Sequence, residues 1–185
     1  MAIRISTEAK LLDAAEELFF TRGIAATPVD AVLERAGVSA ATLYRGYAGK
    51  DALVAAALER RHRLWLEAWD AAVGAQSTPQ GRLLAVFDAL DAFRTRPVGA
   101  RWCAFLASAA EYPDAPDDVR SALERDSDTM RERLTALAGE HGHRNPGELA
   151  AELMLVITGD LAMRLRDPAH DTGTARRVAA RLIAP

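Results

Sequence analysis

The chain has 185 residues, with 23 lysines and arginines against 26 acidic residues, a net charge of -3 and a single cysteine, Cys103. One cysteine excludes an internal disulfide, and this length can bury a substantial core without one. No stretch reaches the roughly 18 uncharged residues that span a bilayer, and the first residues lack the apolar run of a signal peptide. We therefore expect a cytoplasmic protein.

The charge is unevenly distributed along the chain. Residues 1–63 carry nine basic and eight acidic residues, whereas residues 64–185 carry 14 and 18. The segment from Arg35 to Lys50 holds three basic residues and no acidic one. A local positive surface on a weakly charged protein suits a compact, specific nucleic-acid site better than sequence-indifferent coating.

The first predicted helix lies near the N-terminus. Ser6 or Thr7 can cap its start, and Gly23 can end it by taking the left-handed conformation. Its apolar residues follow helical spacing: Leu11, Ala14, Ala15, Leu18 and Phe19.

Two short helices around a tight turn are predicted next. Thr27-Pro28 marks the start of the first helix, and Gly37 allows the turn after it. Ser39 can cap the second helix, which Gly46 and Gly49 cut short. This arrangement is a helix-turn-helix, an element whose second helix binds in the major groove of DNA.

The rest of the chain also has the apolar spacing of helices. A long helix begins near Lys50 and is predicted to run to about Ala72. Further helices are expected around residues 83–93, 102–110, 119–137, 149–165 and 174–183, separated by glycine and proline breaks. We expect an all-α fold of about nine helices, with a three-helix DNA-binding domain over residues 1–50 and a larger effector and dimerisation domain over residues 51–185.

The second helix of the pair carries side chains suited to DNA. Thr42, Tyr44 and Arg45 lie within one turn, and the planar guanidinium of Arg45 matches the acceptors of guanine. Lys50 can hold a phosphate at the start of the next helix. The predicted DNA-binding residues are Thr27, Ser39, Ala40, Ala41, Thr42, Tyr44, Arg45, Tyr47 and Lys50.

Some of these residues have a purely structural alternative. Tyr44 and Tyr47 could be core aromatics, and Lys50 could be a solvated cap. Ala40 and Ala41 either allow close approach to the groove or are simply good helix formers.

These motifs resemble the TetR family of bacterial transcriptional regulators. The similarity covers about the first 55 positions and includes Ala36-Gly37-Val38-Ser39, Thr42-Leu43-Tyr44, Tyr47 and Lys50 with the acid after it. Two later segments, Cys103-Ala104-Phe105-Leu106 and Ala109-Ala110-Glu111-Tyr112-Pro113, are similar to a recurring effector domain of the family. The resemblance implies a homodimer on a near-palindromic operator, usually a repressor, released when a small molecule fills the second domain.

Large apolar side chains in the second domain suggest the effector site. Three tryptophans, each with an indole N–H that needs a partner, favour a cavity with polar points, although such residues are more often ordinary core. We expect a small, largely apolar effector between the Trp65-Trp69 helix and the Trp102-Phe105 helix. The predicted lining residues are Trp65, Trp69, Phe87, Phe93, Trp102, Phe105, Met130 and Met154.

The last two helices are the predicted dimer interface, because the apolar run around Ile157 is too long for a monomer's surface. The expected interface residues are Leu153, Ile157, Asp160, Leu161, Arg164, Val178 and Leu182. Asp160 is costly to bury unpaired, so it pairs with Arg164 or Arg101, orients a ligand or faces the partner.

Other function classes have little support in the sequence. No glycine-rich phosphate loop, nucleophile elbow or zinc-protease motif is present, so an enzyme is disfavoured, and no cofactor or metal is expected. The pair His141 and His143 is expected to be a loop, and Cys103 a buried apolar residue. A helical adaptor without DNA binding remains the other alternative, but it leaves the basic short helix without a purpose.

Overall fold

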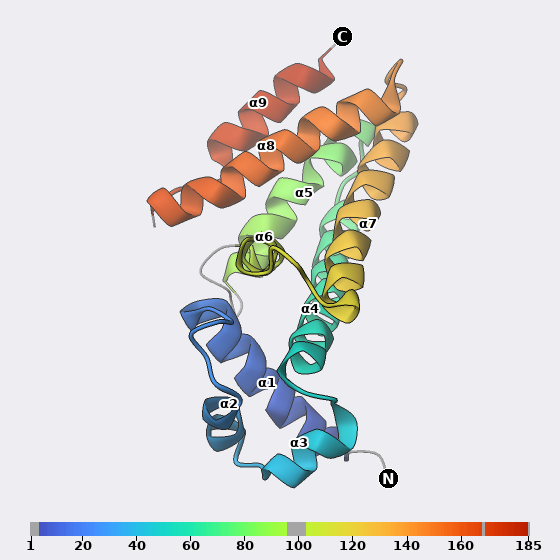
Figure 1. The fold of residues 1–185 in the computed structure, drawn as a ribbon. Coiled ribbons are helices and arrows are strands. Elements are labelled where there is room, and N and C mark those ends of the chain that lie inside the picture. Colours follow the sequence, from blue (N-terminus) through green and yellow to red (C-terminus); the bar gives the residue numbers. More distant parts are fainter. Residues whose placement is uncertain (1–3, 96–102, 168, 185) are drawn as a thin grey trace. The chain divides into compact units, whose positions relative to one another are not determined.

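The computed structural model describes residues 4–95, 103–167 and 169–184. These residues form nine helices and no strand, which confirms the predicted all-α class (Figure 1). The helices are α1 (Ile5–Arg22), α2 (Val29–Ala36), α3 (Ala40–Gly46), α4 (Lys50–Gly74), α5 (Pro79–Arg94), α6 (Ala104–Glu111), α7 (Asp117–His141), α8 (Pro146–Arg166) and α9 (Gly173–Ile183). None of the described helices is both long and apolar enough to cross a membrane.

The described residues divide into two compact units. The first contains the chain up to His62 together with Cys103 to Glu124, and the second contains Arg63 to Thr95 and the chain from Arg125 onward. Helices α4 and α7 each contribute residues to both units without a break. The sequence suggests a functional division at residue 50, and this division stays a prediction. The packing units differ from it, because the first unit extends to His62 and includes α6 and the start of α7.

Local signals in the sequence set the end of α2 and the start of α3. Gly37 adopts φ 66 and ψ 36 at the turn after α2, a left-handed conformation that glycine takes without a side-chain clash. The hydroxyl of Ser39 caps α3 by accepting from the backbone N–H of Thr42. The start of α1 differs from the expectation, because Ser6 and Thr7 lie inside a helix whose N-cap is Arg4.

The core of the first unit joins distant parts of the sequence. Leu11, Leu43 and Leu58 are 0% exposed, and each such leucine contributes about 1.5–3 kcal/mol through burial. Ala104 of α6 and Val119 of α7 belong to the same apolar cluster. Helix α6 and the start of α7 are therefore part of the unit that holds the helix-turn-helix.

The second unit has its own core on the C-terminal part of α4 and on α5, α7, α8 and α9. Its largest fully buried side chains are Trp69, Phe87, Leu83, Leu134, Leu149, Leu153 and Ile157. Helix α9 lies beside α8 and also packs against α5 (Figure 1).

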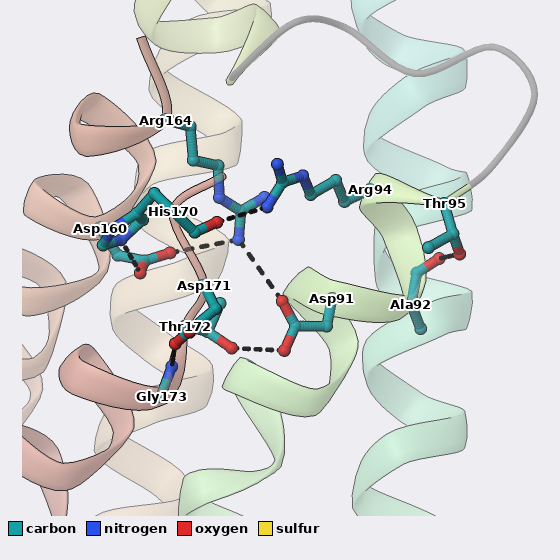
Figure 2. A network of polar contacts seen from close by, with 10 residues as sticks. All are labelled: Asp91, Ala92, Arg94, Thr95, Asp160, Arg164, His170, Asp171, Thr172 and Gly173. Atoms are coloured by element: carbon teal, nitrogen blue, oxygen red, sulfur yellow. Dashed lines mark hydrogen bonds and ion pairs between the residues drawn. The ribbon is translucent and has the colours of Figure 1, made fainter. Parts of the chain in front are cut away.

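A polar network fixes the segment between α8 and α9 (Figure 2). The buried carboxylate of Asp160 lies 3.1 Å from Arg164 Nη2 and 2.9 Å from His170 Nε2. The hydroxyl of Thr172 donates to Asp91 on α5, and Arg94 Nη1 donates to the carbonyl of His170 at 2.6 Å. The expected Asp160–Arg164 ion pair is therefore present, while Arg101 lies outside the described residues.

Removing the carboxylate at the centre of this network should destabilise the protein. Asp160→Ala leaves the guanidinium of Arg164, 6% exposed, without its closest anion. We expect a loss of about 3–5 kcal/mol in the free energy of unfolding, measured by chemical denaturation. Asp128→Ala breaks the exposed Arg131–Asp128 pair and should cost less than about 1 kcal/mol. Equal losses in the two variants would contradict the role given to Asp160.

Candidate nucleic-acid interface

Helix α3 is short and depends on its neighbours for its position. It has seven residues, fewer than an isolated helix needs for stability in water. Leu43 is 0% exposed and anchors the helix in the core of the first unit, and the Ser39 cap fixes its start. The opposite face of α3 is therefore presented to solvent by a fixed backbone.

The exposed face of α3 carries several of the predicted DNA-binding residues. Tyr44 is 62% exposed, and Arg45, Ala40 and Ala41 are also exposed. Thr42 Oγ1 accepts from Arg45 Nη2 at 3.0 Å. This bond directs the guanidinium along the helix surface, where its other N–H groups can reach an acceptor on a ligand.

Lys50 follows α3 by four residues in the sequence, at the first position of α4. Its Nζ lies 5.9 Å from the centroid of the Phe19 ring, and this cation–π contact stabilises the position of the side chain. The ammonium group has three donors, so this contact leaves it able to bind a phosphate. Ser39, Thr42, Arg45 and Lys50 thus form a group of donors on α3 and its flanking residues.

Two predicted DNA contacts point inward instead. Thr27 is 1% exposed, and its hydroxyl donates to the carbonyl of Gly23 at 2.7 Å. Tyr47 packs against the core, and its hydroxyl donates to Glu8 Oε1 at 3.0 Å. Both side chains hold the helix-turn-helix together, which corrects the expectation of direct contact for Thr27 and favours the core alternative for Tyr47.

Sequence reasoning missed an ion pair that links α1 to α4. Glu16 is 3% exposed, and its Oε1 lies 2.5 Å from Arg60 Nε, while Arg60 Nη2 lies 2.7 Å from Asp13. Burial raises the pKa of Glu16, opposed by the hydrogen bond and the charge of Arg60. The sequence held one signal for this ion pair, because Glu16 lies among the inward-facing positions of the amphipathic helix α1 and a buried carboxylate needs a partner.

The predicted effector residues fall in both units. Trp65, Trp69 and Phe93 form an aromatic cluster in the second unit, with Trp65 5.5 Å from Trp69 and 5.7 Å from Phe93 between ring centroids. The guanidinium of Arg133 lies 4.8 Å from the Trp69 ring.

The other predicted effector residues are more dispersed. Phe87 is buried, whereas Met130 and Met154 are partly buried. Phe105 belongs to the first unit, where its ring meets His62 edge-on at 6.3 Å. Trp102 lies outside the described residues.

Most of the predicted dimer residues are buried inside the protomer. Five of them are at most 8% exposed, namely Leu153, Ile157, Asp160, Leu161 and Arg164. Val178 is 40% exposed, and Leu182 is partly buried. The large apolar side chains that α8 exposes are Leu155 at 75%, Leu165 at 53% and Met163 at 40%.

Comparisons with known proteins identify the family. Residues 11–57 match the family model of the bacterial regulatory proteins of the TetR family, and residues 79–179 match that of the tetracyclin repressor-like C-terminal domain. The chain therefore belongs to the TetR family of bacterial transcriptional regulators.

Solved structures agree with this assignment. A TetR-family regulator from Streptomyces coelicolor is 28% identical with a TM-score of 0.82, and the match covers 96% of this chain and 92% of that chain. A TetR regulator from Streptomyces avermitilis is 25% identical with a TM-score of 0.81, covering 96% of both chains. One from Cytophaga hutchinsonii, 15% identical over 99% of this chain and 96% of that one, has a TM-score of 0.83 and shows the fold alone. No curated protein sequence matches the chain.

The inward position of Tyr47 predicts a loss of stability at alkaline pH. Burial and the hydrogen bond to Glu8 raise the pKa of Tyr47 from 10.0 to about 12. Between these values the unfolded chain loses this proton while the folded chain keeps it, so stability falls as the pH rises. Tyr47→Phe should reduce this fall, measured by chemical denaturation at about pH 9 and about pH 11. Identical pH dependence in variant and wild type would contradict the inward placement.

Proposed function

We propose that this protein is a dimeric repressor that binds a near-palindromic operator through α3 and is released by a small, largely apolar effector. The observation that carries the proposal is the exposed face of α3, where Tyr44 and Arg45 project from a helix anchored by the fully buried Leu43. Membership of the TetR family supports the regulatory role, and relatives of known structure are transcriptional regulators rather than enzymes. Such a protein acts on the chromosome, so we place it in the cytoplasm.

Base and phosphate contacts are divided among the residues around α3. Arg45 is assigned to a guanine in the major groove, because its fork can donate two parallel hydrogen bonds. Lys50 is assigned to a phosphate, together with the hydroxyls of Ser39 and Thr42. Ala40 and Ala41 are exposed and small, which lets the helix backbone approach the groove closely.

The dimer is proposed to form through the exposed face of α8. Leu155 lies at the centre of this face, and the small residues Ala151, Gly159 and Ala162 recur near it at spacings of three and four residues. Small residues let two helices approach closely, and a leucine exposed by 75% would be buried in the contact. A dimer with a two-fold axis presents two α3 helices, and a near-palindromic operator requires them on successive major grooves, about 34 Å apart.

The effector is proposed to bind at the aromatic cluster of the second unit. The indole Nε1 of Trp69 is buried and has no hydrogen-bond partner among the described residues, so a ligand acceptor would satisfy it. Trp65 and Phe93 provide apolar contact area beside it. An effector can release DNA only by binding more tightly to the state that does not bind the operator.

A selection of bound fragments from the source genome tests the proposal. The wild-type protein should enrich a fragment with a near-palindromic site, whereas an enzyme or a helical adaptor without DNA binding should enrich none. If the protein enriches no fragment, even at low salt, the proposed function is wrong.

Two substitutions separate base reading from phosphate binding. Arg45→Ala should weaken operator binding by about 1–3 kcal/mol and relax specificity at one base position in each half-site. Lys50→Ala should weaken binding to all sequences alike and lower the slope of log affinity against log salt by about one for each phosphate that Lys50 neutralises. Gel-shift titrations at several salt concentrations measure both. Unchanged affinity in Arg45→Ala would remove Arg45 from the reading surface.

The α8 face is tested by adding a charge at its centre. Leu155→Glu would bury two carboxylates at the two-fold axis, so the dimer dissociation constant should rise at least about a hundredfold. Sedimentation velocity should detect monomers that keep their helix content. Ala136→Glu, which adds the same charge at an exposed position of α7, is the control and should stay dimeric. A Leu155→Glu protein that also stays dimeric would exclude this face.

A further inference from the structure

Two consecutive residues at the end of α6 hold the helix-turn-helix on both of its sides. Glu111 Oε1 accepts from the backbone N–H of Ile24 at 3.0 Å, and Oε2 accepts from that of Ala25 at 2.8 Å. The hydroxyl of Tyr112 donates to Asp51 Oδ1 at 2.7 Å. Ile24 and Ala25 precede α2, whereas Asp51 follows α3 in the first turn of α4. The pair therefore brackets the two helices of the motif.

The backbone before α2 is shaped to receive the carboxylate. Gly23 adopts φ 97, and a β-carbon at this position would stand 3.4 Å from each carboxylate oxygen of Glu111. The N–H of Gly23 bonds to the carbonyl of Phe19, and the N–H of Thr27 bonds to that of Ile24. The N–H groups of Ile24 and Ala25 follow that of Gly23 in the sequence, and both donate to the carboxylate of Glu111. Hydrogen bonds to a charged acceptor are about twice as strong as neutral ones, so the two bonds to Glu111 stabilise the position of this backbone segment.

We propose that Glu111 and Tyr112 are positioning residues for operator binding, tethering both sides of the helix-turn-helix to α6. The proposal rests on the proposed function, and it concerns residues that lie on α6 or directly after it, outside the motif. Helix α3 is too short to keep its own orientation, so the segments that enter and leave the motif must be fixed. Tyr112 fixes the exit through a hydroxyl whose pKa is raised by burial and by its bond to Asp51.

Electrostatics alone predicts the opposite result for Glu111, which makes the test decisive. Removing an acidic residue from a DNA-binding unit reduces repulsion of phosphates and should strengthen binding if the tether has no role. The tether predicts weaker binding in Glu111→Ala, by about tenfold. The salt slope should stay that of the wild type, because no phosphate-binding group is removed. Tyr112→Phe should weaken binding by about threefold, since one neutral donor is removed.

The experiment uses full-length protein and the best fragment from the genomic selection. Affinity is measured by gel shift, and amide exchange of Ile24 and Ala25 is followed by NMR or mass spectrometry. Glu111→Ala should exchange faster at these two amides, while core amides near Leu11 and the melting temperature change little. Glu111→Gln keeps one acceptor oxygen and should lie between the wild type and Glu111→Ala. Asp114→Ala, which removes an exposed carboxylate three residues away, is the control and should bind as tightly as the wild type or slightly more tightly.

Each outcome decides for or against the tether. Weaker binding with an unchanged salt slope and faster exchange supports it. Unchanged or tighter operator binding by Glu111→Ala overturns it, and so does unchanged exchange at Ile24 and Ala25. A wild-type protein that binds no fragment overturns the proposed function as well, whereas a wild type that binds while the variants match it overturns only the tether.

Discussion

The burial of Leu43 is the contact on which the rest of the site depends. A helix of seven residues has a nucleation cost that its own hydrogen bonds do not recover, so tertiary contacts decide whether α3 exists. Leu43 supplies the apolar contact, Ser39 the cap, and Tyr47 a hydrogen bond from the end of the helix to α1. With its inner face so held, the helix can present a polar outer face at little further conformational cost.

The sequence predicted the parts of the fold that local chemistry determines. Gly37 takes the left-handed turn, Ser39 caps α3, and α4 begins at Lys50, because each depends on a residue and its near neighbours. The family resemblance was likewise carried by contiguous motifs. The failures came where tertiary contacts decide. Thr27 is predicted to lie at the DNA surface, yet its hydroxyl donates to the carbonyl of Gly23 at the end of α1.

The predicted dimer residues stay a prediction, and tertiary contacts decide their surroundings as well. An apolar run such as that around Ile157 must be covered on all sides, but periodicity does not say whether α5, α9 or a second chain covers it. In the structure Ile157 faces the protomer's own core, and Leu155 is the exposed residue. The role of Glu111 was equally out of reach, since its partners lie 87 and 86 residues away and carry no pattern of their own beyond backbone N–H groups.

The discontinuity of the first unit has a consequence for dissecting the protein. Ala104, Val119 and Ala122 fill the same core as Leu11 and Leu58, although more than 40 residues separate the two segments in the sequence. A fragment truncated after His62 would keep every residue of the motif but expose the apolar patch that α6 and α7 cover. Such a fragment would be prone to self-association, so the motif cannot be treated as a portable module that is excised at a linker.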